Sequence, residues 1–132
     1  MTREEFEQLV EQEFPNAIPE QFRDKIKNVA FLVEDEPSIE LRKREGLRPN
    51  ETLLGYYRGI PATARGDLYG IGATLPDTIT LFRLTIEDEA RLTGQGIAKV
   101  VRDTIWHEVA HHFGYDERQV RAKEAKRDSM ER

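Results

Sequence analysis

The chain of 132 residues contains no cysteine. Disulfides, thiolate metal sites and cysteine nucleophiles are therefore excluded, and any metal site must use histidine, carboxylate and water. The chain also has no excess of basic residues. It contains 20 lysine and arginine residues and 25 aspartate and glutamate residues, which gives a net charge of −5. Phosphate groups are bound by basic surfaces, so this balance argues against nucleic acid and against anionic membranes as partners.

Long apolar runs are absent as well. No segment approaches the roughly 20 apolar residues that a membrane-spanning helix needs. The first ten residues, MTREEFEQLV, are charged where a secretory signal would be apolar. We therefore expect a soluble, cytoplasmic protein. The length fits one domain over residues 1–132, and the chain shows no internal repeat or low-complexity linker.

The order of predicted elements indicates an α+β fold. Thr2 and Glu5 have the spacing of a capping box, and the helix that follows should end at Pro15. Strands are predicted at residues 29–35, 53–61 and 78–84, the first of them fully buried. Further helices are predicted at residues 19–28, 37–46, 95–113 and 116–127, with a helical turn at 88–92. The glycine-rich residues 62–77 should be irregular, with at most a short edge strand.

Histidine is scarce, and all of it lies in the segment TIWHEVAHHFGYDE, residues 104–117. His107 and His111 are four residues apart on the longest predicted helix, so they project from one face of it. With Glu108 they form H-E-x-x-H, in which two imidazoles bind zinc and the glutamate accepts a proton from the attacking water. His112 lies about 100° further around the helix and is expected to have a packing or hydrogen-bonding role.

A zinc peptidase site needs a third protein ligand and leaves its fourth position to water. Gly114 permits a sharp turn after the helix, and the residue three positions beyond it, Glu117, is our predicted third ligand. Asp116 competes for this place, although its offset from Gly114 is wrong and it is well placed to cap the last helix. Glu124 is a further candidate, as in zinc sites whose glutamate comes from a following helix.

These residues resemble the minimal zincin family of small bacterial zinc metallopeptidases. HEVAHHFGYDE is similar to the signature H-E-x-x-H-x-x-G-x-x-D, and the segments LLGYYRGIPATARG and LPDTITLFR are similar to the family in the same order. The resemblance covers about residues 31–120 and implies a zincin-like core, with a small mixed or antiparallel sheet packed on the motif helix. It also implies His107 and His111 as ligands and Glu108 as catalytic base. Glu117 departs from the signature, being one methylene longer than aspartate.

Two classes of function follow from these residues. The first is a zinc-dependent metallopeptidase that hydrolyses peptide bonds in a peptide or protein substrate, with zinc-activated water and Glu108 as general base. The alternative is a zinc-binding regulatory module that holds a peptide or partner with little or no turnover. Glu108 disfavours the alternative, since a pure binding site needs no base. For Tyr56, Tyr57, Tyr69 and Arg83, packing or surface roles are expected ahead of substrate contacts.

Overall fold

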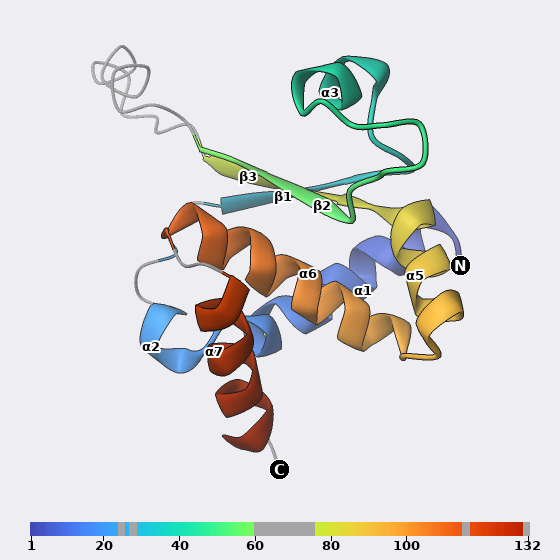
Figure 1. The fold of residues 1–132 in the computed structure, drawn as a ribbon. Helices are drawn as coiled ribbons and strands as arrows, with labels where there is room; N and C mark the ends of the chain where they lie inside the picture. The colour runs from blue at the N-terminus through green and yellow to red at the C-terminus, as the bar shows by residue number, and fades with distance from the viewer. Residues whose placement is uncertain (24–25, 27–28, 60–75, 115–116, 131–132) are drawn as a thin grey trace, which may run out of the picture.

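The computed structural model describes residues 1–132 except residues 24–25, 27–28, 60–75, 115–116 and 131–132. Its helices and strands form the predicted α+β fold (Figure 1). Their bounds are α1 Arg3–Ala17, α2 Glu20–Arg23, β1 Val29–Glu34, α3 Ile39–Arg44, β2 Gly55–Arg58, β3 Asp77–Phe82, α5 Arg83–Thr93, α6 Ile97–His112 and α7 Glu117–Met130. No described helix is both long enough and apolar enough to cross a membrane.

The sheet is small and mixed, with the strand order β1-β3-β2. The central strand β3 runs parallel to β1 and antiparallel to β2. Ile79 and Leu81 of β3 are fully buried, and Leu81 lies opposite Val33 of β1 and Gly55 of β2. Because side chains alternate along a strand, Tyr57, which lies opposite Ile79, shares this inner face. β2 is therefore an edge strand whose inner face meets the helices.

Helices α1 and α6 cover the inner face of the sheet, and α3 lies on its other side (Figure 1). Val101, Ile105 and Val109 of α6 are fully buried at helical spacing, whereas Phe113, just past the end of the helix, is 39% exposed. Trp106 is also fully buried, and its indole N–H donates a hydrogen bond to the backbone oxygen of Val120, 3.2 Å away. This bond joins α7 to α6, so the helix that carries the histidines contacts the sheet on one side and α7 on another.

The first helix begins as predicted and ends later. The hydroxyl of Thr2 accepts from the Glu5 N–H, and the Glu5 carboxylate accepts from the Thr2 N–H, both at 3.1 Å. The predicted end at Pro15 is wrong, because α1 continues to Ala17 with Pro15 inside it. Proline lacks the N–H that a helix interior uses. The last turn, however, places Ala17 and Ile18 in the core, and their burial offsets the missing bond.

Three other predicted elements need correction. The strand at residues 29–35 is β1, but it is an edge strand in which only Val33 is buried and Leu32 is 47% exposed. The helical turn at 88–92 is the longer α5, which begins directly after β3, so Arg83 and Leu84 are helical and not part of a strand. The helix at 19–28 is limited to α2 among the described residues, and most of the glycine-rich segment 62–77 lies outside them.

Candidate metal and catalytic site

The site lies where β2 crosses α6, and a glycine permits this close approach. A Cβ atom on Gly55 would be 2.8 Å from Cγ2 of Thr104 and 3.2 Å from the backbone oxygen of Thr80. Real Cβ atoms essentially never lie within 3.0 Å of such a neighbouring atom, so the 2.8 Å contact with Thr104 could not form. Only glycine therefore allows β2 to lie against α6 within one turn of His107 and Glu108.

Glu108 is partly buried beside β2. One carboxylate oxygen, Oε1, accepts a hydrogen bond from the backbone N–H of Tyr57 at 3.2 Å. Burial raises the pKa of Glu108 above its usual range and outweighs the lowering effect of this hydrogen bond. A carboxylate with a raised pKa is a better proton acceptor near neutral pH than an ordinary glutamate.

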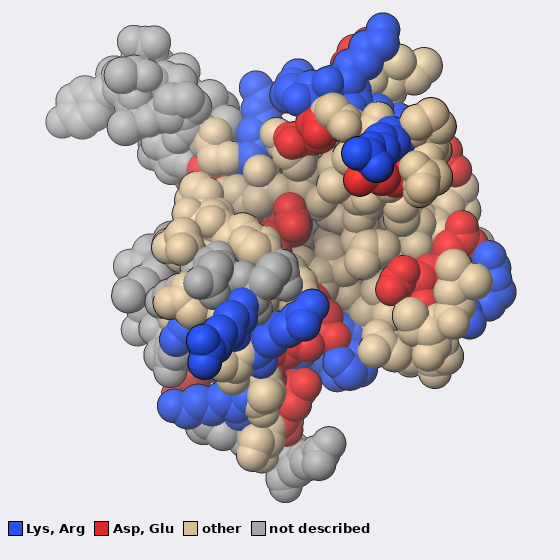
Figure 2. All heavy atoms as spheres, viewed as in Figure 1, with Lys and Arg blue, Asp and Glu red and all other residues tan. Residues whose placement is uncertain are grey.

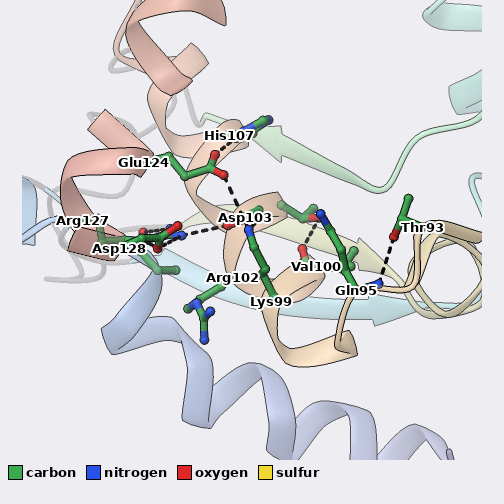
Figure 3. A network of polar contacts seen from close by, with 12 residues as sticks. Thr93, Gln95, Lys99, Val100, Arg102, Asp103, His107, Glu124, Arg127 and Asp128 are labelled. Carbon is green, nitrogen blue, oxygen red and sulfur yellow. Dashed lines mark hydrogen bonds and ion pairs between the residues drawn. The ribbon is translucent and has the colours of Figure 1, made fainter. Parts of the chain in front are cut away.

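His107 is in contact with a carboxylate from the next helix. Its Nε2 lies 2.8 Å from Oε2 of Glu124, as Figure 3 shows. The other oxygen of Glu124 faces Lys99, whose ammonium nitrogen is 3.9 Å from Oε1. Glu124 was the further candidate for the third ligand, and it is the one that the described part of the chain brings to His107.

The remaining predicted site residues do not join this pair in the described structure. His111 is exposed near the end of α6. Glu117 begins α7, but its side chain lies outside the described residues, as does the whole of Asp116. Among the described residues, no three histidine, aspartate or glutamate side chains meet closely enough to hold a metal ion. The assignments of His111, Glu117 and Asp116 therefore stay predictions.

His112 has the packing role that was expected of it. Its ring stacks on Tyr57 of β2, with the ring centres 4.1 Å apart and the planes inclined by 20°. The hydroxyl of Tyr57 in turn donates to Asp77 of β3 at 2.7 Å. His112 thus fixes the C-terminal end of α6 against the sheet, on a different side of the helix from Glu124.

A chain of charged groups continues from Glu124 into the protein (Figure 3). Lys99 contacts Asp103 at 2.6 Å, and Asp103 accepts from Arg127 at 2.8 Å. Burial opposes ionisation of Asp103, but the bonds from Lys99 and Arg127 outweigh it and lower the pKa of this carboxyl. This network was not predicted from the sequence. Its signal was the four-residue spacing of Lys99, Asp103 and His107, which forms a polar stripe on α6.

A cavity of about 320 Å³ opens beside His107 and Glu108. Its apolar walls include Leu53 and Leu54 before β2 and Val100 of α6. Figure 2 shows a hollow on this face, between the basic side chains over α3 and those over α7. The cavity can receive a side chain of a bound molecule while Glu108 stays within reach of its backbone.

Comparison with known families agrees with this geometry. The zincin-like metallopeptidase model matches residues 26–127, which include the sheet, α6 and most of α7. The chain belongs to the zincin-like metallopeptidases. A comparison with curated proteins finds no matching sequence. The family relates this chain to zinc-binding hydrolases of peptide bonds.

The donor atoms of this zincin-like metallopeptidase can be compared with those that zinc prefers. Two imidazoles on one helix face and a carboxylate from the following segment are donors that suit zinc well. The contact between His107 and Glu124 already joins an imidazole nitrogen to a carboxylate oxygen. The donor types therefore fit zinc.

Proposed function

We propose that this protein is a zinc-dependent metallopeptidase in which Glu108 is the general base. The observation that carries the proposal is the environment of Glu108. It follows His107 on α6, lines the cavity, and has a pKa raised by burial. A carboxylate with these properties is suited to accept a proton from water and to pass it to a leaving amine.

His107 and His111 are proposed as zinc ligands, because they stand one turn apart on the same face of α6. The third protein ligand is proposed to be a carboxylate that follows α6, and the motif assigns that position to Glu117. Zinc in such a site acts as a Lewis acid on the scissile carbonyl and lowers the pKa of water. These assignments rest on the spacing of the motif and on the family.

The edge strand β2 supplies a means of holding the substrate. β2 pairs with β3 on one side only among the described residues, so its outer edge can pair with an extended peptide. The N–H of Tyr57 already points away from β3, to Glu108. A peptide carbonyl that took this N–H would free Oε1 of Glu108 to accept a proton, and a side chain of the peptide would enter the neighbouring cavity.

A second candidate is a zinc-binding module that holds a peptide with little or no turnover. The hydrogen bond from the Tyr57 N–H to Oε1 of Glu108 favours it, because a carboxylate that already accepts a hydrogen bond is a weaker proton acceptor. Hydrolysis measurements on metal-loaded protein separate the two candidates.

The test compares wild type with His107→Ala, His111→Ala and Glu108→Gln. Wild type should bind about one zinc per chain and cleave members of a peptide library, as detected by mass spectrometry, and a chelator should stop cleavage. Both alanine variants should lose stoichiometric zinc. Glu108→Gln should keep zinc and lose hydrolysis, because an amide cannot accept the proton.

Each outcome bears on one part of the proposal. Unchanged zinc affinity in either alanine variant would remove the metal site. Wild-type turnover by zinc-loaded Glu108→Gln would show that another group is the base. Zinc binding by wild type without cleavage of any library member would favour the binding module.

A further inference from the structure

The cavity beside His107 and Glu108 extends along α6. Its lining includes Val100, Thr104 and Glu108, which follow one another at intervals of four residues on one face of the helix. The distance along the helix axis from Val100 to Glu108 is about 12 Å. A side chain that enters at Glu108 therefore finds room for several methylene groups.

The walls of this cavity are largely aliphatic. Leu53 and Leu54, which precede β2, are half-buried, and Val100 on the opposite side is 3% exposed. Such walls favour an apolar stem over a short polar side chain. Lysine and arginine have stems of this kind, and they bury them along apolar surface while the charged end stays with polar groups.

The charges that line the cavity are acidic. Glu89, Asp103 and Glu108 contribute carboxylates, and none of the described lining residues is lysine or arginine. In Figure 2 acidic atoms lie inside the hollow on this face, whereas the basic side chains in view lie outside it. Carboxylates without nearby cations create a negative potential, so the cavity attracts a positively charged group.

Two of the three carboxylates are already bonded. Asp103 accepts from Lys99 and from Arg127. Glu108 accepts from the backbone of β2, and its proton transfer is needed for the proposed reaction. The carboxylate that is left for a bound cation is therefore that of Glu89.

Glu89 also differs from its neighbours on α5. The carboxylate of Glu87 lies 3.6 Å from Arg83. The carboxylate of Asp88 pairs with Arg91. Glu89 is half-buried, and its side chain has no ion pair or hydrogen bond with the residues that the structure describes. A half-buried carboxylate beside apolar walls is stabilised when a cation binds to it.

We propose that this cavity is the specificity pocket of the enzyme and that it takes a lysine or arginine side chain of the substrate. The stem of that side chain packs against Leu53, Leu54 and Val100, and its cationic end pairs with Glu89. The inference rests on the proposed function and names its class of substrate, which is peptides with a basic residue next to the cleaved bond.

The experiment compares peptides that differ in a single charge. Norleucine has the aliphatic stem of lysine and lacks its ammonium group. Lysine and norleucine are placed in turn on either side of the scissile bond of a peptide that the zinc-loaded wild type cleaves, and kcat/KM is measured for each. The variants are Glu89→Gln and the control Asp88→Asn, which removes a neighbouring carboxylate that does not line the cavity.

We expect wild type to prefer lysine over norleucine at one of the two positions by about tenfold, as a charged and partly exposed pair would give. In Glu89→Gln this ratio should fall close to one, and Asp88→Asn should keep the wild-type ratio. A wild-type ratio in Glu89→Gln would overturn the inference, and so would cleavage by wild type with no preference for lysine. The latter result would leave the proposed peptidase activity intact.

A binding measurement separates the pocket from the reaction. Fluorescein-labelled alanine peptides with a central lysine or norleucine are titrated with the metal-free proteins, and fluorescence anisotropy reports binding. Tighter binding of the lysine peptide to wild type than to Glu89→Gln, without cleavage of any peptide, would support the pocket and contradict the proposed activity. A wild type that distinguishes lysine from norleucine in neither measurement overturns the inference.

Folding of the variants is checked by circular dichroism. If Glu89→Gln does not fold, Glu89→Ala takes its place, because alanine has the highest helix propensity and should preserve α5. The same loss of lysine preference is expected of that variant.

Discussion

His111 and His112 are neighbours in sequence, yet their side chains have different surroundings. Adjacent residues on a helix point about 100° apart. His112 is directed to the sheet, where its ring stacks on Tyr57, and a Cβ atom on Gly59 would approach the same ring to 3.0 Å. His111 shares the face of His107, one turn further along α6. Of the two residues, only His111 is placed to bind a metal ion together with His107.

We predict that His112→Ala keeps the zinc affinity of wild type, whereas His111→Ala loses it. Because His112 stacks on Tyr57, its removal should lower the free energy of unfolding by about 1 kcal/mol or less. Zinc titration and urea unfolding of the metal-free variants measure the two quantities. Loss of stoichiometric zinc in His112→Ala would show that this ring, too, can reach the metal.

The sequence predicts the residues that lie within one helix more reliably than those that meet between helices. His107, Glu108 and His111 follow from helical spacing, which is a local property. The contact of Glu124 with His107 depends on how α7 docks, through Trp106 and Arg127. No local pattern specifies that docking, so from the sequence Glu124 was only one of several candidate carboxylates.

At the scale of elements, the close approach of β2 to α6 shapes the site. Gly55 lies against Thr104, and Tyr57, two residues on, donates its N–H to Glu108. Any side chain at position 55 would push the strand away from α6. Of the two glycines in the predicted strand at 53–61, Gly55 is therefore the one at which the strand backbone contacts α6.

We predict that Gly55→Ala lowers the free energy of unfolding by about 2 kcal/mol, because its Cβ would lie 2.8 Å from Cγ2 of Thr104. The matched control is the Thr104→Ser background, which lacks Cγ2 and retains the hydroxyl that donates to Val100. In that background Gly55→Ala should cost markedly less. Urea unfolding of the four proteins gives the coupling between the two positions. Equal costs in both backgrounds would contradict the steric explanation.

Features of helices and strands that depend on short-range spacing in the sequence were predicted well. Features that depend on how deeply an element is buried were predicted poorly. The capping box of α1 is present as predicted, and the long helix predicted at 95–113 is α6. The apolar run VAFLVED was expected to be fully buried, but it forms an edge strand with Leu32 exposed. Its composition indicates a strand and carries no information about how many neighbours that strand has.

At the scale of the whole molecule, one buried arginine connects three helices. Arg127 of α7 donates to the backbone oxygen of Ala17, where α1 ends, and to Asp103 of α6. The last helix was predicted to end at residue 127, but α7 continues to Met130, and Arg127 is only 5% exposed. A charged residue near the end of a chain gives no sign in the sequence that it is buried, because its partners are distant in sequence.

We predict that Asp103, which is bonded to Lys99 and Arg127, makes the stability of the fold depend on pH in the acid range. The pKa of Asp103 is lower in the folded protein than in the unfolded chain, where it is about 3.9. The bonds from Lys99 and Arg127 to Asp103 therefore stabilise the fold fully above that value, and their contribution is lost as the pH falls through the folded pKa. At pH 7, Asp103→Asn should lower the free energy of unfolding by on the order of 3 kcal/mol, because it leaves a buried guanidinium with one carboxylate fewer.

The measurement is urea unfolding of wild type and Asp103→Asn from pH 7 down to about pH 2.5, with a chelator present so that zinc does not contribute. The difference in free energy between the two proteins should be constant above about pH 5 and should shrink as the pH falls below the unfolded pKa of about 3.9. Asp128→Asn is the control, because its carboxylate contacts the same arginine but is more exposed than Asp103. A difference between wild type and Asp103→Asn that stays constant down to pH 2.5 would mean that Asp103 is no more acidic in the fold than in the unfolded chain.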